Sequence, residues 1–468
     1  MNHKQLLLLN HKIFSKLNLI LKKTLDDVLS KNCVIQVFGL GYVGFPLLVK
    51  LCTNGFHVLG IDNDLKKIER IQNGELLESE SHLKEIVLKS IHSGDLVVDT
   101  QSAKSEKPRI GIICVPTPIP TKSIQSDIFV KDAVKAFLEM AKKGDVIILE
   151  SSIEVGTTSK MKSMIESMGY KEGEDIGLCF CPERIDPKNK KWNLENIPRV
   201  IYCSDDLSFK IAKEIYQYIN NSNLLRVKSA EIAEVVKSFE NAFRLVNISL
   251  VNELAILCDK LGINVRDVLD AAATKPFGFL PFYPGAGAGG HCIPKDPRFL
   301  LESAKKLGLE FKTLENALSI NIQMPKYVVD SIESLLIGKK LKKSVIICGL
   351  SYKPDIEDMR DSPGFKIYNE LTERGFQVAL YDPFFKNELS QKYVIENNIK
   401  DPDFKILPNL SDDSISSYDC LCIVQHHSKL KDRLNEIYKN SKIPIIYDCQ
   451  GNLRSDPSSN STLKILGG

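Results

Sequence analysis

The sequence lacks the cysteine pattern of a metal site or of a disulfide-rich protein. Its 12 cysteines form no Cys-x-x-Cys pair and show no regular spacing with histidine. Cys179 and Cys181, like Cys420 and Cys422, lie two residues apart within apolar runs, which is typical of buried thiols on strands. We therefore expect no metal site and a reducing, cytoplasmic location.

Two further absences narrow the class of protein. The net charge is only +3, from 62 basic and 59 acidic residues, so no basic surface for nucleic acid is indicated. No apolar run reaches the roughly 18 residues of a membrane helix, and lysine and asparagine interrupt the leucine-rich start, as they would not in a signal peptide. We expect no nucleic-acid binding, no membrane insertion, and a helical extension over residues 1–32 that packs on the body or on a partner subunit.

The pattern that is present is an alternation of apolar strands and helical segments. The chain of 468 residues is long enough for two or three domains. The order of strand, glycine turn, helix and strand ending in Asp in "VIQVFGLGYVGFP" and "NGFHVLGIDND" returns in "SVIICGLSYKPD" and "RGFQVALYDPF". Strands are predicted at 33–38, 56–62, 109–116, 145–151, 419–425 and 443–449. This order favours an α/β fold with two Rossmann-like, doubly wound domains.

A long helix is predicted between the two α/β domains. No Gly or Pro occurs from Ser229 to Leu261, and apolar residues recur there at intervals of three and four. The predicted domains are a helical extension (1–32), a dinucleotide-binding domain (33–225), a central helical domain (226–330) and a C-terminal α/β domain (331–468).

The first glycine turn has the full context of a dinucleotide site. Gly39, Gly41 and Gly44 follow a strand and open a helix, and Asp62 ends the next strand. The helix N-terminus would bind the pyrophosphate, and Asp62 would accept hydrogen bonds from ribose and disfavour a 2′-phosphate. We predict NAD as the cofactor, against the alternative of a packing loop. The second turn, "GLSYKPD", lacks the later glycines, and Lys353 there could meet a different phosphate.

A second glycine-rich stretch, "PGAGAGGHCIPKDP", places a thiol beside charged residues. Glycines allow close approach of backbone to a ligand, and cations near Cys292 would favour its thiolate. A thiolate beside an NAD site indicates covalent capture of an aldehyde. His291 allows a Cys–His hydrolase as an alternative, but this would leave the NAD motif unexplained.

Three more polar residues are candidates whose patterns also have ordinary explanations. Lys237 and Asn241 are four residues apart on one helix face and could stabilise an oxyanion, although a solvated helix surface would look the same. Glu183 follows a strand in "FCPERIDP" and could act as a base or hold a water, although it could equally be a loop acid.

Taken together, these motifs resemble the UDP-glucose / UDP-N-acetylglucosamine 6-dehydrogenase family. The resemblance runs from about Cys33 onward and includes "FGLGYVGFP", "VPTP", "ESSIEVGTT", "PERI", "GAGGHCIPKDP" and "GLSYKPDIEDMRDSP". It implies an N-terminal NAD domain, a central helix that forms a dimer core and a C-terminal domain that binds UDP. The implied reaction oxidises C6 of a UDP-sugar from alcohol to carboxylate with two NAD.

The resemblance also assigns roles by position. It makes Cys292 the nucleophile, Lys237 and Asn241 the oxyanion pair, Asp296 a carboxylate that assists proton transfer, and Glu183 the acid tied to thioester hydrolysis. Ser152 stands where Thr is common and would order a water. Implied cofactor contacts are Gly39, Gly41, Tyr42, Val43, Gly44, Asp62, Thr117, Ser152 and Arg360. Implied substrate contacts are Glu183, Arg184, Lys237, Asn241, Tyr283, Gly289 and Lys353.

The loop before Cys292 and the stretch "ENAFRLVNISLVNEL" look most like those of members that act on N-acetylated hexoses, and this resemblance implies UDP-N-acetylglucosamine as the substrate. UDP-glucose, UDP-N-acetylgalactosamine and UDP-N-acetylmannosamine remain alternatives within the family. Two alternatives lie outside this reaction. A two-electron hydroxy-acid dehydrogenase would give Cys292 no role, and a non-catalytic nucleotide-binding protein would give none of the polar candidates a role. The resemblance implies a homodimer or higher homo-oligomer through the central helix.

Overall fold

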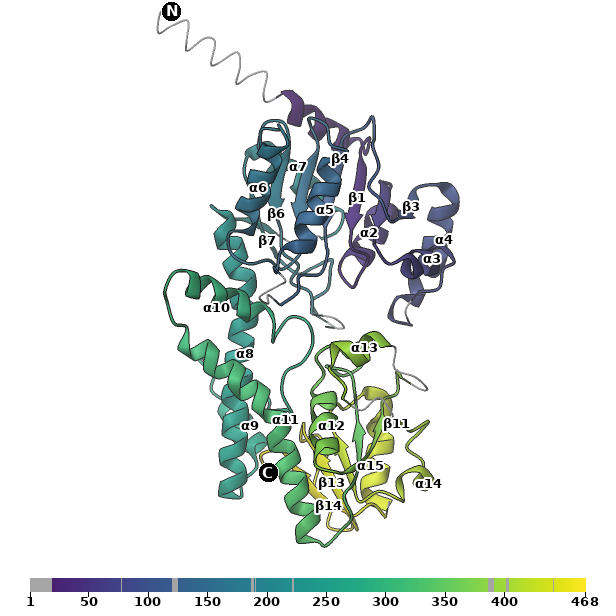
Figure 1. Cartoon of the computed structure of the whole chain (residues 1–468), viewed down its shortest axis with the longest axis vertical. Coiled ribbons are helices and arrows are strands. Elements are labelled where there is room, and N and C mark those ends of the chain that lie inside the picture. The colour runs from purple at the N-terminus through teal and green to yellow at the C-terminus, as the bar shows by residue number, and fades with distance from the viewer. Residues whose placement is uncertain are drawn as a thin grey trace, which may run out of the picture. The chain divides into compact units, whose positions relative to one another are not determined.

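The computed structural model describes residues 19–76, 78–119, 125–186, 189, 191–220, 223–385, 391–400, 404–440 and 442–468. The chain divides into two compact units, Met1–Phe239 and Glu240–Gly468 (Figure 1). Residues 1–18 of the expected extension lie outside the described residues.

The first unit is built on a sheet in the order β3-β2-β1-β4-β5-β6-β7-β8. All described pairs are parallel except β6 with β7. The chain returns to a neighbouring strand through a helix at each parallel step, which is the doubly wound arrangement. The strands are β1 (Val34–Phe38), β2 (His57–Ile61), β3 (Leu96–Asp99), β4 (Arg109–Ile113), β5 (Val146–Leu149), β6 (Gly177–Phe180), β7 (Arg199–Cys203) and β8 (Leu224–Arg226).

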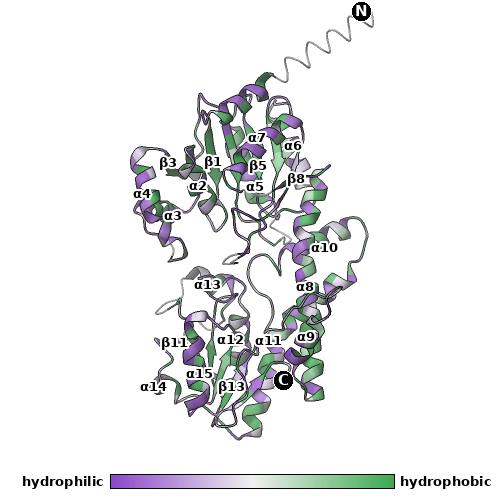
Figure 2. Cartoon of the chain, turned by 180° about the vertical axis from the view of Figure 1, so that it is seen from behind, coloured by the Kyte–Doolittle hydropathy of each residue, from purple (hydrophilic) through white to green (hydrophobic). Residues whose placement is uncertain are grey.

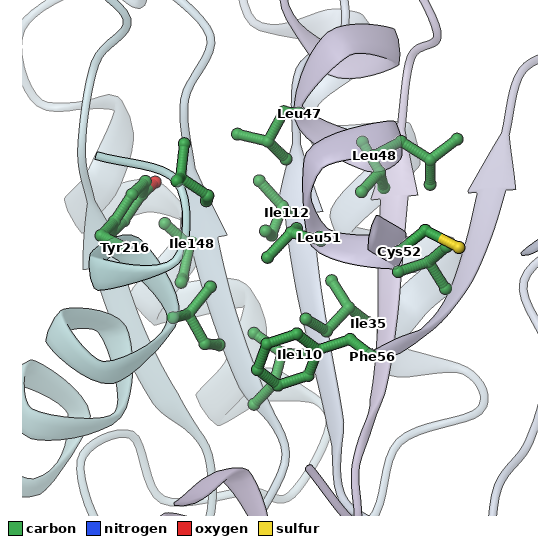
Figure 3. Packing of buried hydrophobic residues seen from close by; sticks show 14 of the residues in the cluster. Ile35, Leu47, Leu48, Leu51, Cys52, Phe56, Ile110, Ile112, Ile148 and Tyr216 are labelled. Carbon is green, nitrogen blue, oxygen red and sulfur yellow. The ribbon is translucent and has the colours of Figure 1, made fainter. Parts of the chain in front are cut away.

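Helices cover this sheet with their apolar sides. Figure 3 shows Leu47, Leu48 and Leu51 on one helix, and Tyr216 on another, packed against isoleucines of the strands. The described part of the extension, helical over 19–29, adds Leu21 and Val28 to the same core, so it packs on the body. The helices are α2 (Gly44–Thr53), α3 (Leu65–Gln72), α4 (Lys84–Ser93), α5 (Ile128–Leu138), α6 (Thr157–Ser167) and α7 (Asp206–Gln217), with a 3-10 helix η1 (Glu78–Leu83).

The cysteines of this unit correct one expectation. Cys179 on β6 and Cys203 on β7 are directly opposite in the antiparallel pair and form a disulfide, with a Cα–Cα distance of 4.2 Å. The prediction of a buried thiol is therefore wrong for Cys179, because β7 reverses direction and brings Cys203 next to it. Cys181, Cys420 and Cys422 are buried thiols, as expected.

The predicted long helix is α8, Ala230–Leu261. Its start belongs to the core of the first unit through Ala233. Its later turns belong to the second unit, where Ala242 and Leu245 pack against α10 (Asp296–Lys306) and α11 (Lys312–Gly338). By length and composition alone, α8 is long and apolar enough to cross a membrane. The sequence analysis did not predict this, because no uninterrupted apolar run in the chain reaches that length. Its buried face instead carries Glu234, Lys237, Asn241 and Asn252, as expected for a helix shared by two folded units.

The second unit contains a parallel sheet in the order β11-β10-β9-β12-β13-β14. Figure 2 shows its strands mainly in the hydrophobic colour, as expected for a sheet covered on both faces. Its strands are β9 (Ser344–Cys348), β10 (Gln377–Tyr381), β11 (Lys405–Ile406), β12 (Cys420–Ile423), β13 (Ile445–Asp448) and β14 (Thr462–Ile465). Its other helices are α9 (Val265–Ala273), α12 (Pro363–Glu373), α13 (Gln391–Glu396), α14 (Asp412–Ile415) and α15 (Lys431–Asn440), with a 3-10 helix η2 (Ser428–Leu430). The predicted class, two α/β domains joined by a helical part with one long helix, is confirmed.

Candidate active site

The first glycine turn has the shape that a dinucleotide requires. A Cβ on Gly44 would lie 2.0 Å from the carbonyl oxygen of Gly39, and one on Gly39 would lie 2.7 Å from that of Cys114. A Cβ on Gly41 would meet no atom of the described chain within 4 Å. Gly44 and Gly39 thus serve close packing, whereas the backbone at Gly41 faces open space at the start of α2. Tyr42 is exposed there and Val43 caps the helix. The turn fits a pyrophosphate.

Asp62 lies at the end of β2 and is tied to this turn. Its Oδ2 accepts hydrogen bonds from the backbone N–H of Leu40, at 2.9 Å, and from Lys67 Nζ, at 2.6 Å. Its Oδ1 accepts from the N–H of Asp64 at 3.1 Å. The carboxylate is therefore fixed at the position where the acidic residue of a dinucleotide site stands, with Lys67 as an additional neighbour that the sequence did not suggest.

Two loops meet at the carboxyl ends of β4 and β5, where ligands of doubly wound sheets bind. Thr117, after β4, is buried, and Ser152, after β5, is half-buried. The neighbouring Ser151 donates from its hydroxyl to the carbonyl of Val115 at 2.7 Å. This hydrogen bond joins the loop that carries Thr117 to the loop that carries Ser152, the two predicted cofactor contacts.

Glu183 is the carboxylate of a buried ionic network at the same edge of the sheet. Its Oε1 accepts from the backbone N–H groups of Arg184, at 2.6 Å, and Ile185, at 2.7 Å. Its Oε2 accepts a short hydrogen bond from Arg199 at the start of β7. Arg184 itself turns away and donates to the carbonyl of Pro198 at 2.8 Å.

Arg199 also faces a second carboxylate, Glu150, with 3.3 Å between its Nη1 and the Oε2 of Glu150. Tyr216 on α7 donates to Glu150 Oε1 at 2.5 Å. Burial raises the pKa of Glu150, and Arg199 opposes that rise. Burial disfavours the Arg199 charge, but Glu183 and Glu150 outweigh it, so the pKa of Arg199 lies well above its ordinary value. The sequence motifs gave no role to Arg199, Glu150 or Tyr216. The available signal was a charged residue beside an apolar strand, since Glu150 follows β5 and Arg199 begins β7, whereas Tyr216 lies within α7 and had no such signal.

Lys237 lies on the buried face of α8, with only 8% of its surface exposed. One turn earlier, Glu234 accepts hydrogen bonds from the backbone N–H groups of Gly156, at 2.6 Å, and Thr158, at 2.8 Å, at the start of α6. The solvated-surface explanation of the Lys237 face is wrong. Glu234 instead anchors this part of α8 to the loop that follows Ser152.

Asn241 and Asp296 come together in the second unit. Asn241 Nδ2 donates to Asp296 Oδ2 at 2.7 Å, and both residues are buried. Asp296 Oδ1 has no hydrogen-bond partner among the described residues, and Lys295 Nζ lies 3.6 Å from it. A buried carboxylate oxygen in this state is suited to accept a proton or a water.

Cys292 is exposed and lies directly before the helix that carries Asp296. The backbone N–H of Asp296 donates to the carbonyl of Cys292 at 2.9 Å, which ties the thiol to the first turn of α10. His291, its neighbour, has a pKa lowered to about 2 by burial and by the charges of Lys295 and Arg360. A histidine held neutral in this way is a poor partner for a Cys–His hydrolase.

The glycines before Cys292 have a packing role. A Cβ on Gly289 would lie 2.4 Å from the carbonyl oxygen of Asp361, and one on Gly290 would lie 2.6 Å from the ring of Tyr352. The N–H of Gly290 donates to the carbonyl of Arg360 at 2.9 Å. These glycines therefore let the cysteine loop lie against residues 352–361, the loop after β9.

The remaining predicted contacts lie on loops of the second unit. Tyr283 donates to Asp270 at 3.0 Å and stacks under Arg266. Arg360 forms a two-pronged ion pair with Asp358: its Nε donates to Oδ1 at 3.0 Å and its Nη2 donates to Oδ2 at 2.6 Å. Lys353 is half-buried in the loop after β9. Both Lys353 and Arg360 therefore belong to the loop on which Gly289 and Gly290 pack.

The predicted set falls into two groups, each assembled within one unit. The first unit holds Gly39, Gly41, Tyr42, Val43, Gly44, Asp62, Thr117, Ser152, Glu183, Arg184 and Lys237. The second unit holds Asn241, Tyr283, Gly289, Cys292, Asp296, Lys353 and Arg360. The first group has the features of a dinucleotide site, and the second contains a thiol, a carboxylate and an amide.

Comparison with known proteins agrees with this division. Residues 33–220 match the NAD binding domain of the UDP-glucose/GDP-mannose dehydrogenase family, residues 231–323 match its central domain, and residues 346–455 match its UDP binding domain. The chain is 33% identical to a UDP-N-acetyl-D-mannosamine dehydrogenase of Methanococcus aeolicus, over 96% of this chain and 97% of the relative. It is 30% identical to an NDP-N-acetyl-D-galactosaminuronic acid dehydrogenase of Ralstonia nicotianae, over 75% of this chain and 83% of the relative.

Solved structures lead to the same family. A structure of the UDP-D-ManNAc dehydrogenase from Pyrococcus horikoshii superposes with a TM-score of 0.79 at 27% identity, covering 93% of this chain and 99% of that one. The UDP-N-acetyl-mannosamine dehydrogenase Cap5O from Staphylococcus aureus gives 0.78 at 30% identity, covering 93% and 98%. With its three matched domains, the chain belongs to the UDP-glucose/GDP-mannose dehydrogenase family and is an NAD-dependent UDP-sugar dehydrogenase.

Proposed function

We propose that the protein oxidises C6 of a UDP-N-acetylhexosamine from alcohol to carboxylate, with Cys292 as the covalent nucleophile. The observation that carries this proposal is the group around Cys292, in which an exposed thiol precedes α10 and the buried Asp296 on that helix accepts a hydrogen bond from the buried Asn241 on α8. Each turnover consumes one water and two NAD and yields two NADH and three protons.

The residues divide the chemistry as follows. The turn of Gly39, Gly41 and Gly44 would hold NAD, which would supply the hydride acceptor for each of the two oxidations. Lys237, or a water ordered by it, takes the proton of the C6 alcohol. Cys292 Sγ adds to the resulting aldehyde carbon and forms a thiohemiacetal, which the second hydride loss converts to a thioester.

The oxyanions of these steps would be stabilised by Lys237 and Asn241, a cation and an amide donor. Water cleaves the thioester, with Glu183, Ser152 and Asp296 in the roles of holding it and receiving its proton. Lys353, Arg184, Tyr283 and Gly289 are the proposed substrate contacts. Arg360, Thr117, Tyr42, Val43 and Asp62 complete the proposed cofactor contacts.

The sugar that we propose first is UDP-N-acetylglucosamine, on the sequence of the loop before Cys292. The names of the relatives support UDP-N-acetylmannosamine as a second candidate. A panel of UDP-glucose and the UDP-linked N-acetyl derivatives of glucosamine, galactosamine and mannosamine, scored by NADH released per sugar consumed, decides between them. Two NADH per sugar are expected for the true substrate; one per sugar would contradict the covalent cycle.

The nucleophile is tested by Cys292→Ala. We expect the variant to form no uronate while it still binds NAD, because the glycine turn at Gly39–Gly44 and Asp62 lie on the other unit. Cys422→Ala, at a buried thiol on β12, is the matched control and should keep full turnover. Full turnover by Cys292→Ala would refute the mechanism.

We also propose that the chain forms a homodimer through α8. The apolar stripe of this helix is exposed, with Phe239 at 55%, Leu250 at 62% and Leu257 at 52%. Large apolar side chains in a row on one helix are typical of an interface. Leu250→Arg should turn a dimer into a monomer in sedimentation; a wild-type chain that sediments as a monomer would exclude the dimer.

The domain assignment that we propose remains 1–32, 33–225, 226–330 and 331–468. A cytoplasmic location is supported by the ten of 12 cysteines that form no disulfide. Fractionation of the native host, with the activity followed by NADH formation, tests it.

A further inference from the structure

Two buried arginines of the first unit lie at opposite ends of the strands of one sheet. Arg109, at the start of the parallel strand β4, donates to Asp145 Oδ2 from Nε at 3.0 Å and from Nη2 at 2.7 Å. Arg199 starts β7, which is antiparallel to β6, so it lies at the carboxyl ends of β5 and β6. Glu150 follows β5 there and Glu183 follows β6. Only this second arginine stands at the edge where ligands bind.

The contacts of Glu183 leave its carboxylate little freedom. Two backbone N–H groups bind Oε1, and Arg199 binds Oε2. Arg199 in turn is held between the two carboxylates, and its guanidinium lies over the ring of Tyr216 at 4.9 Å from the centroid. The four side chains of this network (Glu183, Arg199, Glu150 and Tyr216) are all at least nine-tenths buried.

The charges of the network are unequal: one guanidinium faces two carboxylates. Removing the cation would leave Glu150 and Glu183 buried beside each other, and such a pair repels and tends to take up a proton. Lysine would keep the charge but lose the fork that reaches both carboxylates at once. The arginine is thus suited to fix the orientation of Glu183.

We propose that Arg199 is a positioning residue that aligns Glu183 for hydrolysis of the Cys292 thioester, and that Glu150 and Tyr216 hold Arg199 in place. This inference rests on the proposed function. In the step concerned, the oxygen of water bonds to the thioester carbon and the C–S bond breaks. Cys292 leaves as the thiolate, the protons pass to solvent, and no oxidation state changes. The network thus affects hydrolysis and leaves both hydride transfers intact.

The test compares Arg199→Lys with Arg109→Lys, a matched change at the other edge of the same sheet. Arg199→Lys should lower steady-state turnover by about 10- to 100-fold, as misplacement of a group by about an ångström does. The ratio kcat/KM for the UDP-sugar and the affinity for NAD should stay within about threefold, so KM falls together with kcat, because the steps before the thioester are intact. Intact-protein mass spectrometry during turnover should show the sugar acyl group on Cys292. Arg109→Lys should lower the melting temperature without an accumulated adduct.

Tyr216→Phe provides a milder variant, which decides the matter if Arg199→Lys does not fold. It removes only the hydroxyl that binds Glu150, and we expect turnover about two- to fivefold lower with the same adduct. Turnover within twofold of wild type in Arg199→Lys, an equal adduct in Arg109→Lys, or no adduct in Tyr216→Phe would overturn the inference. A wild-type enzyme that oxidises no UDP-sugar would instead contradict the proposed function itself.

Discussion

The two α/β units use the same turn, a glycine after the first strand, for different purposes. In the first unit, Gly41 faces open space and Asp62 binds the N–H of Leu40 and the side chain of Lys67. In the second, Ser351 stands at the corresponding place and donates to the carbonyl of Ile356 at 2.7 Å. Asp382, the counterpart of Asp62, binds the N–H groups of Leu350 and Ser351 at 2.7 and 3.0 Å.

A histidine completes the difference between the turns. His427 Nε2 lies 3.1 Å from Asp382 Oδ2, and its Nδ1 accepts from the N–H of Asp355 at 3.0 Å. Since Nδ1 accepts, the proton is on Nε2, and a neutral imidazole donates to the carboxylate. The second turn is thus filled by its own side chains. The middle of the turn is therefore open at Gly41 in the first copy, whereas in the second copy hydrogen bonds within the unit hold it at Ser351.

The largest difference between the copies is expected at the glycine in the first turn of the helix that follows each glycine turn, Gly44 in α2 and Gly364 in α12. Gly44→Ala places a Cβ 2.0 Å from the carbonyl of Gly39, whereas Gly364→Ala places one 3.2 Å from that of Gly349. We expect Gly44→Ala to lose about 3 kcal/mol of stability and NAD affinity by at least about tenfold. Gly364→Ala should stay within about 1 kcal/mol of wild type, because helix propensity offsets the contact. Denaturant melts and NAD titration measure both; equal losses would remove the distinction.

Effects of intermediate size are expected at the two corresponding acids, Asp382 and Asp62. The first should mainly affect stability and the second mainly NAD binding. Asp382→Asn should cost about 2–3 kcal/mol, because a buried carboxylate with several donors is lost, and KM for NAD should not change. Asp62→Asn should cost about 1 kcal/mol of stability and raise KM for NAD about tenfold. Urea denaturation beside NADH kinetics checks the pair. An increase in KM for NAD in Asp382→Asn would mean that the glycine turn of the second unit takes part in cofactor binding.

The smallest effects are expected when the middle residues of the turns are exchanged. Gly41→Ser should leave stability unchanged, since nothing lies within 4 Å of the new Cβ, and should raise KM for NAD about three- to tenfold by occupying the pyrophosphate position. Ser351→Gly should cost about 1 kcal/mol with normal KM, because the bond to Ile356 is lost. Thermal melts and initial rates distinguish the two; a Gly41→Ser variant with normal KM would show that the open space is not used.

Much of the fold and part of the site followed from local pattern. Strand spacing, the glycine turn before α2 and the uninterrupted run from Ser229 to Leu261 predicted the sheets and α8, because each depends on residues close in sequence. The pattern on α8 did not predict which face the chain buries. The apolar stripe is exposed and the face with Lys237 and Asn241 is covered. Apolar periodicity reveals that a helix has two faces, but the packing partners decide which one is inside.

By itself, the sequence determined the family and the cofactor, and it named candidate residues for the chemistry, because all of these are encoded in short motifs. Tertiary structure alone decided that Arg199 meets Glu183 and Glu150 and that Cys203 meets Cys179. Both meetings depend on β7 running antiparallel to β6, which makes residues far apart in sequence neighbours across two strands. Tertiary structure also decided that Gly289 and Gly290 are needed for close packing, because only the folded chain places Asp361 and Tyr352 against them. Strand direction and contact between distant loops are properties of the whole sheet, and no short motif contains them.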